Sequence, residues 1–249
     1  MKIGTWNVNG IRARHAQFEE WVMKEQPDIV CLQEIKAGPT QVPQNVCELP
    51  GYACYWHGAG GYSGVALHVR RAAFSGEPGF SHPSFDNETR IVQVLLGDTV
   101  FASVYVPNGG KDFPAKMAFM GELRDYAASV HRDGRKLVIC GDLNVARTDM
   151  DVHPKERKPR AIGQLPEERA LLEEIIAQGL VDVGRMLYPT DENYFTWWAP
   201  WRNLRQRNIG WRLDYAFVSE GLAKTATECA VRAEVGTSDH APVVASFDI

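Results

Sequence analysis

The sequence lacks several features that mark particular classes of protein. None of its apolar runs approaches the roughly 20 residues that a membrane-spanning helix needs. The first residues, MKIGTWNVNG, lack the apolar core and the small-residue cleavage site of a signal peptide. The five cysteines are an odd number, and no two of them have CxxC spacing. We therefore expect a protein of the reducing cytoplasm, without a membrane partner or a cysteine-based zinc site.

Positive charge is also scarce, because 27 Lys and Arg face 31 Asp and Glu and leave a formal net charge of −4. Any nucleic-acid binding must then come from local patches. The sequence has no HExxH motif, no tandem repeat and no linker rich in Gly, Ser or Pro. A chain of 249 residues with 45% apolar residues can bury a large core. We predict one domain over residues 1–249.

Short apolar runs rich in β-branched residues alternate with segments of helical spacing. The runs predict strands at the N-terminal KIGTW and at residues 29–32, 65–69, 91–96, 100–106, 137–140, 215–218 and 243–247. Apolar residues at helical spacing predict helices within residues 14–26 and 114–131, and another after Pro166. This mixture indicates a layered α/β or α+β domain.

Polar side chains follow the ends of several predicted strands. They are Asn7 and Asn9, Gln33 and Glu34, Tyr105 and Asn108, and Asp142 and Asn144, while Asp214 and Ser238-Asp239-His240 precede the last two strands. Strand ends combine a rigid backbone with access to solvent, which suits a functional site. Each position alone fits a turn or a helix cap. The set as a whole favours a site.

The candidate site is rich in oxygen, with Glu34, Asp142, Asp239, Asn7 and Asn144. Such donors suit Mg²⁺, with Mn²⁺ as an alternative, better than Zn²⁺, and the histidines are scattered along the chain. A magnesium site with one or two direct carboxylates leaves room for phosphate oxygens, which indicates phosphoryl chemistry. A carboxylate or a histidine would prepare the attacking water, and an Asp–His pair would orient the imidazole.

A second feature is the segment of residues 196–213. It holds four tryptophans and four arginines and no acid before Asp214: Trp197, Trp198, Trp201, Trp211, Arg202, Arg205, Arg207 and Arg212. One interpretation is a core aromatic cluster beside a solvated basic loop. The other is contact with nucleic acid, with Arg on phosphates and Trp against bases. Apolar and basic residues interleave here without a helical or strand period, which favours the second interpretation.

A series of motifs, taken in order, resembles one known family. The motifs are Thr5-Trp6-Asn7-Val8-Asn9-Gly10, Leu32-Gln33-Glu34, Tyr62-Ser63-Gly64, Tyr105-Val106-Pro107-Asn108, Gly141-Asp142-Leu143-Asn144, Gly210-Trp211-Arg212-Leu213-Asp214-Tyr215 and Ser238-Asp239-His240. From residue 3 to about residue 247 the chain resembles the exonuclease III family of abasic-site endonucleases, within the endonuclease/exonuclease/phosphatase superfamily. The resemblance implies an α/β fold: a four-layer, DNase I-like sandwich of two packed mixed β-sheets flanked by helices.

The same resemblance implies a Mg²⁺-dependent DNA repair enzyme that cleaves the phosphodiester 5′ to an abasic site, with 3′→5′ exonuclease or 3′-phosphatase activity beside it. It assigns the metal site to Glu34, Asn7 and Asp239, and the catalytic roles to Tyr105, Asp142, Asn144, Asp214 and His240. In these roles Asp142 activates water or protonates the leaving oxygen, and Asp214 orients His240. Tyr105 contacts the scissile phosphate, and Asn144 positions Asp142.

The resemblance also implies residues that contact double-stranded DNA. Trp197, Trp211 and Leu213 match the pocket for the flipped-out sugar, Lys36 and Arg90 match basic positions near the phosphate, Asn108 lies on the substrate side, and Lys111 and Trp201 match positions that enter the grooves. Asn9 stands where some members have Asp. We expect a monomer. Two alternatives stay open: an enzyme that mainly trims 3′ ends, and a DNA-binding protein without catalysis.

Overall fold

The computed structural model describes all residues, 1–249, and contains two six-stranded mixed sheets. The first sheet has the order β11 (Ala226–Val231), β12 (Val243–Phe247), β1 (Lys2–Asn7), β2 (Ile29–Gln33), β4 (Val65–Arg70) and β3 (Tyr52–His57). The second has the order β5 (Phe80–Ser81), β6 (Ile91–Leu96), β7 (Thr99–Tyr105), β8 (Lys136–Asp142), β10 (Asp214–Ser219) and β9 (Leu180–Asp182). Within these sheets β1 pairs with β2, and β7 with β8, in parallel.

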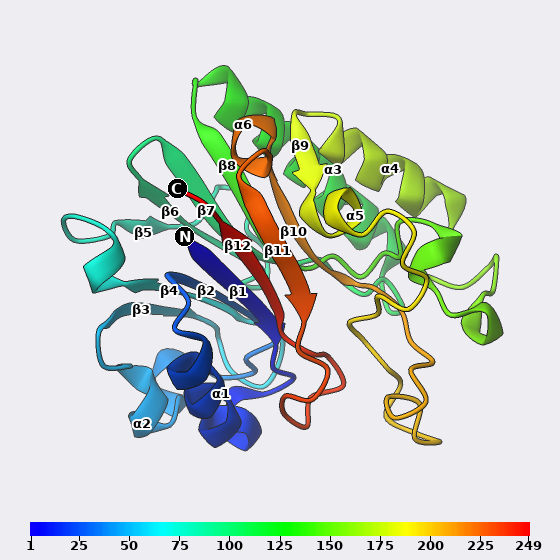
Figure 1. Cartoon of the computed structure of the whole chain (residues 1–249), viewed down its shortest axis with the longest axis horizontal. Helices are drawn as coiled ribbons and strands as arrows, with labels where there is room; N and C mark the ends of the chain where they lie inside the picture. Colours follow the sequence, from blue (N-terminus) through cyan, green and yellow to red (C-terminus); the bar gives the residue numbers. More distant parts are fainter.

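Helices cover the outer face of each sheet (Figure 1). They are α1 (Ile11–Glu25) and α2 (Gln44–Cys47) on the first sheet, and α3 (Phe113–Arg132) and α4 (Pro166–Ile176) on the second, with the short α5 (Val183–Leu187) and α6 (Glu220–Ala223) near β9 and β10. Three apolar clusters separate the four layers, and the central one joins the inner faces of the two sheets. The four-layer sandwich of the prediction is therefore confirmed.

The local sequence explains where the long helices begin and end. The Asp112 carboxylate accepts a hydrogen bond from the Ala115 N–H at 2.9 Å and so caps α3, and Pro114 occupies its first turn. Helix α1 begins after Gly10 and ends at Glu25, and the next residue, Gln26, has a left-handed backbone. No helix combines the length and apolar character that crossing a bilayer requires.

The predicted strands are the interior ones. All eight interior strands coincide with predicted runs, within one or two residues at each end. The four strands that the sequence analysis missed, β3, β5, β9 and β11, are the edge strands of the two sheets. Edge strands are short or partly exposed, as the mixed burial of β3 and β11 illustrates, so they lack the continuous apolar run that marks an interior strand.

His68 on β4 is a buried histidine that makes stability depend on pH. Both ring nitrogens are buried without a hydrogen-bond partner, between Phe18 and Trp56. Burial lowers the pKa of His68 to about 3 from an ordinary value of 6.5. The unfolded chain therefore binds a proton at His68 at a higher pH than the folded chain does. The contribution of neutral His68 to the free energy of unfolding is complete above pH 6.5 and is lost as the pH falls toward 3.

We expect the His68→Leu variant to lose less stability in acid than the wild type. Relative to that of the wild type, the free energy of unfolding of His68→Leu should rise by about 1.4 kcal/mol per pH unit below 6.5, to a gain of about 2 kcal/mol at pH 5. Urea unfolding of both proteins at pH 5 and pH 7.5 measures the difference. A difference in unfolding free energy that stays constant with pH would contradict this assignment.

Candidate active site

Strand ends from both sheets meet at one end of the sandwich. Asn7 ends β1, Glu34 follows β2, and Asp142 ends β8, while Asp214 begins β10 and His240 precedes β12. In the second sheet Tyr105 pairs with Asp142, which in turn pairs with Asp214, so these three lie side by side on neighbouring strands. The fold thus places polar side chains together as the sequence analysis expected.

A cavity of about 340 Å³ opens at this end. Ten predicted site residues and Ile162 line it: Glu34, Tyr105, Asn108, Asp142, Asn144, Trp197, Trp211, Leu213, Asp239 and His240. Asn7 and Asp214 lie behind this lining and hold it in place. A second hollow of about 400 Å³ behind Trp198 gathers no comparable group of acids and histidines. The chemistry therefore points to the smaller cavity.

The buried side chains of Asp142, His240 and Asp214 form a chain across this cavity. Nδ1 of His240 lies 2.8 Å from Oδ2 of Asp214, and Nε2 lies 3.8 Å from Oδ2 of Asp142. Asp214 therefore fixes the imidazole so that its second nitrogen faces Asp142. The Asp142 carboxylate also accepts hydrogen bonds from the backbone N–H of Asn144 at 2.9 Å and from the side chain of Asn7.

Asn7 links two carboxylates. Its Nδ2 donates to Oδ2 of Asp142 at 2.9 Å and to Oε2 of Glu34 at 3.0 Å, while its Oδ1 accepts from the Asn9 N–H. In this arrangement Asn7 positions Glu34 and Asp142, and its oxygen is already engaged by the backbone. The assignment of Glu34, Asn7 and Asp239 to a metal stays a prediction, since Asn7 Oδ1 keeps a second lone pair beside its bond to the Asn9 N–H.

Polar neighbours also hold Asp239 and Glu34. Asp239 accepts from Asn9 Nδ2 at 2.8 Å and from the indole N–H of Trp197 at 3.0 Å. Lys36 Nζ donates to Asn9 at 2.7 Å and lies 2.8 Å from Glu34 Oε1. Asn9, which stands where some family members have Asp, therefore connects the two carboxylates. Its Nδ2 bonds to Asp239, and its Oδ1 bonds to Lys36, which lies beside Glu34.

Two residues of this site have an unusual backbone conformation. Glu34 and Asn144 have φ of 54° and 51°, in the left-handed region that costs a residue with a side chain about 1–3 kcal/mol. At Gly141, which precedes Asp142, a Cβ atom would lie 1.9 Å from the backbone oxygen of Val104. Glycine therefore allows β8 to approach β7 closely beside the Asp142 carboxylate.

Burial and neighbouring charge shift the pKa values of the central groups. Burial, helped by Asp214, raises the pKa of Asp142 to about 7. Burial by itself would lower the pKa of His240, but Asp214 and Asp142 outweigh it and raise this pKa to about 10. Around neutral pH, Asp142 is thus poised to exchange a proton while His240 keeps its positive charge.

The donor set fits a divalent cation. Four carboxylates, those of Glu34, Asp142, Asp214 and Asp239, converge here, and Lys36 and His240 bring positive charge close to them. Oxygen donors of this kind suit a hard cation. Glu34 and Asp239 would hold it, and the bound ion would stabilise negative charge on a substrate phosphate.

Aromatic and apolar side chains form the wall opposite the acids. Trp197 and Trp211 meet edge to face, with ring centroids 5.6 Å apart, and Leu213 and Ile162 complete the wall. The predicted pocket residues Trp197, Trp211 and Leu213 therefore lie in one cavity with the catalytic candidates. Ile162, which the sequence analysis did not select, comes from a loop whose sequence has no distinguishing motif.

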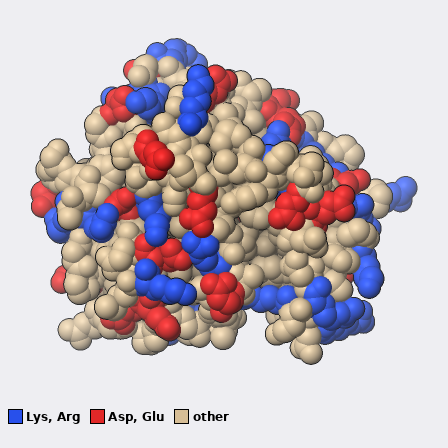
Figure 2. Space-filling model, in the orientation of Figure 1, with Lys and Arg blue, Asp and Glu red and all other residues tan.

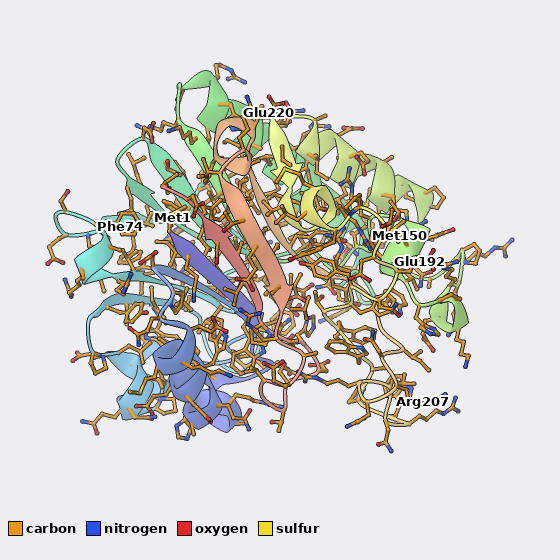
Figure 3. The ribbon with its side chains drawn as sticks, viewed as in Figure 1. Met1, Phe74, Met150, Glu192, Arg207 and Glu220 are labelled. Atoms are coloured by element: carbon orange, nitrogen blue, oxygen red, sulfur yellow. The ribbon has the colours of Figure 1, made fainter.

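The segment of residues 196–213 divides into buried and exposed parts, so the two interpretations of it apply to different residues. Trp198 belongs to a core cluster, and buried Arg212 pairs with Asp151 and Asp182. Trp201 is 60% exposed, and the exposed Arg207 marks the tip of this loop (Figure 3). Figure 2 shows Lys and Arg gathered at the same tip. The exposed tip, with Trp201 and Arg207, and the cavity wall, with Trp197 and Trp211, are the parts of the segment that are open to a partner.

Four predicted DNA contacts lie outside the cavity lining: Lys36, Arg90, Lys111 and Trp201. Lys111 and Trp201 are exposed. The guanidinium of Arg90 is buried between the rings of Tyr62 and Tyr105, 5.3 and 5.0 Å from their centroids, and pairs with Glu88. In this arrangement Arg90 supports Tyr105 from behind and is not open to a phosphate.

Two residues that the sequence did not single out, Thr196 and Lys116, hold site residues in position by hydrogen bonds. The Thr196 hydroxyl donates to Oδ2 of Asp214 at 2.6 Å and accepts from the Asp214 N–H. The ammonium group of Lys116 on α3 is fully buried and donates to the backbone oxygens of Asn108 and Asn144 and to Glu168. Neither residue belongs to one of the quoted family motifs, so only the helical spacing around Lys116 hinted that it faces inward.

Comparison with known proteins agrees with this geometry. The sequence pattern of the Endonuclease/Exonuclease/phosphatase family matches residues 4–240. The chain belongs to this family. It is 36% identical to Recombination repair protein 1 of Drosophila melanogaster, over 100% of this chain and 37% of that protein. It is 34% identical to the exodeoxyribonuclease of Bacillus subtilis, over 98% of both.

Solved structures of family members share the whole fold. The AP endonuclease of Archaeoglobus fulgidus has a TM-score of 0.90 at 28% identity, and the match covers 100% of both chains. The 3′ phosphatase NExo from Neisseria, bound to a product DNA hairpin, has a TM-score of 0.89 at 30% identity with the same coverage. The resemblance to exonuclease III-type abasic-site endonucleases is therefore confirmed.

Proposed function

We propose that residues 1–249 form one catalytic domain of a Mg²⁺-dependent DNA repair nuclease that cuts the backbone 5′ to abasic sites and also acts on 3′ ends. The observation that carries the proposal is one cavity that holds the Asp142–His240–Asp214 chain beside Glu34 and Asp239, with Trp197 and Trp211 opposite. The names of family members, which include AP endonuclease, exodeoxyribonuclease and 3′ phosphatase, support the same reaction class.

The proposed reaction is hydrolysis of a phosphodiester. The water oxygen forms a bond to phosphorus, and the bond from phosphorus to the 3′ oxygen of the preceding nucleotide breaks. Asp142 takes the water proton or supplies the proton of the leaving oxygen, since its pKa of about 7 allows either. Charged His240, oriented by Asp214, and Tyr105 contact the phosphate. The products are a 3′-hydroxyl and a 5′-phosphate.

Selectivity for an abasic site follows from the size and lining of the cavity. About 340 Å³ between the acids and the Trp197–Trp211 wall suits a sugar phosphate. Flipping a nucleotide out of the duplex is least unfavourable where no base pairs or stacks. Trp201 and Lys111, exposed outside the cavity, and Asn108 at its lining would contact the flanking duplex.

The test is a gel assay on three duplexes that carry an internal abasic site, a recessed 3′ end or a 3′-phosphate. We expect Mg²⁺-dependent nicking at the abasic site that a chelator abolishes, with slower release at the 3′ ends. Duplex affinity should fall steeply with salt, as counterion release requires. Digestion of 3′ ends without nicking would instead identify a trimming enzyme. Binding without any cleavage would identify a non-catalytic protein.

We expect Trp211→Ala to reduce cleavage at abasic sites more than it reduces duplex affinity. Loss of this wall should lower kcat/KM on the abasic duplex by about 10- to 100-fold, because one aromatic contact is worth about 1–3 kcal/mol. Trp201→Ala is the matched control, since this exposed tryptophan should affect affinity for abasic and intact DNA alike. Equal losses on both duplexes in Trp211→Ala would argue that Trp211 only supports the fold.

A further inference from the structure

A histidine–carboxylate cluster lies outside the lining of the active-site cavity, where the two sheets meet at one edge. His57 ends β3, the edge strand of the first sheet, and His82 follows β5, the edge strand of the second sheet. Asp86 lies in the turn between β5 and β6. One ligand atom from each of the three lies within 4.8 Å of the others. The histidines are scattered along the chain, and the fold brings these two together.

Aromatic stacking holds the two edges in register. Phe80 stacks on Tyr55 with ring centroids 5.2 Å apart, and His82 stacks on His57 at 4.6 Å with an interplanar angle of 12°. Two aromatic pairs, Phe80 with Tyr55 and His82 with His57, therefore join β5 and its continuation to β3. The meeting of His57 and His82 is thus a feature of how the sheets pack at this edge.

Two backbone N–H groups hold the Asp86 carboxylate in position. Oδ1 of Asp86 accepts the backbone N–H groups of Arg90 and Ile91 at 2.8 and 3.1 Å. Its Oδ2 is turned toward His57 Nε2, 2.5 Å away. Backbone hydrogen bonds that fix a carboxylate in this way are the supporting contacts that metal ligands require. The side chains of His57 and Asp86 are largely buried, whereas His82 is exposed.

We propose that His57, His82 and Asp86 form a zinc site that joins the edges of the two sheets. Two imidazole nitrogens and one carboxylate, with water in the fourth position, make up a common zinc ligand set. Imidazole nitrogens favour zinc over magnesium, so this site differs in chemistry from the oxygen-lined active site.

Zinc binding requires only a local adjustment. Tetrahedral zinc places its ligand atoms about 3.3 Å apart, so the 2.5 Å contact between His57 and Asp86 must widen by less than about 1 Å. Zinc lies in the plane of each imidazole that binds it, so the stacked ring of His82 must tilt. The exposed side chain of His82 has room for this rotation.

Bound zinc would stabilise the folded chain at this edge. It would link β3 to the turn before β6, and that turn carries Glu88 and Arg90 toward the active site. Because the three ligands are far apart in the unfolded chain, zinc binds mainly to the folded state and raises its stability. The site thus stabilises the fold and takes no part in the cleavage chemistry.

The test is calorimetric titration of zinc into the full chain with saturating Mg²⁺, which occupies the active site. We expect one zinc per chain, and His82→Ala or His57→Ala should weaken its binding by about tenfold or more. His153→Ala, which removes a histidine outside any such cluster, is the matched control. His82 is exposed, so its variant should fold even if the His57 variant does not.

Thermal unfolding provides a second measurement. At zinc concentrations about 100-fold above its dissociation constant, the Tm of the wild type and of His153→Ala should rise by about 5–10 °C. The Tm of His82→Ala should not respond. The proposal is overturned if the wild type binds no zinc, if His82→Ala binds it equally well, or if Glu34→Gln abolishes the binding, which would put the zinc in the active site.

Discussion

The Asp142→Asn variant is expected to lose at least about 1,000-fold in turnover while it still folds and binds DNA. Asparagine keeps the shape of the side chain and can still accept the Asn144 N–H bond, but it cannot exchange a proton. Burial raises the pKa of Asp142 to about 7, so removal of its charge relieves an unfavourable burial. The new amide NH2 faces the Asn7 Nδ2 donor, which offsets part of this gain, so we expect little net change in stability. The loss should therefore appear in kcat alone.

Single-turnover cleavage of an abasic duplex, together with fluorescence anisotropy and thermal unfolding, measures these three properties. The matched control is Asp125→Asn, because Asp125 is an exposed acid on α3, far from the cavity lining. Turnover by Asp142→Asn close to that of the control would assign the proton transfer to another group. His240 would be the next candidate, since its Nε2 lies 3.8 Å from the same oxygen.

The Lys116→Met variant should show the largest loss of stability, about 3–5 kcal/mol. Lys116 and Glu168 are both fully buried and pair with each other, so removal of the lysine leaves an uncompensated carboxylate in the core. The variant also loses the bonds from Lys116 Nζ to the backbone oxygens of Asn144, at 2.8 Å, and Asn108, at 3.2 Å. Urea unfolding measures the change.

A double variant separates charge burial from packing. Lys116→Met with Glu168→Gln should be more stable than Lys116→Met alone, because glutamine is neutral and still accepts the Gly163 and Leu165 N–H bonds. The matched control is Lys136→Met, which breaks an exposed pair with Asp98 and should change stability little. If the single and double variants are equally unstable, the loss comes from packing and not from the buried charge.

The same variants report on the active site. Lys116 holds the loop of Asn144, and Asn144 in turn holds the Asp142 carboxylate. We expect the double variant to have a reduced kcat with a nearly unchanged KM for abasic DNA, because none of its lost contacts faces the substrate. A rise in KM with unchanged kcat would mean that Lys116 affects DNA binding and does not position Asp142.

Sequence patterns alone were enough to predict the interior strands, the long helices and most of the cavity lining. Interior strands carry continuous apolar runs because both of their faces are buried, and the polar residues at their ends stand out against that background. Asp142 after LVIC-Gly and Glu34 after IVCLQ therefore stand out as site candidates in the sequence itself. The ordered motifs then identified the family, which the comparisons confirm.

The packing of distant elements determines which polar and charged residues face the cavity and which are structural. Trp and Arg recur throughout the segment of residues 196–213, yet in the folded chain Arg212 and Trp198 are buried and Trp201 and Arg207 are exposed. The supports from Thr196 and Lys116, and the meeting of His57 with His82, depend on elements that are distant in sequence. Local patterns report burial along one element, whereas such contacts depend on how separate elements pack against each other, so no local pattern could predict them.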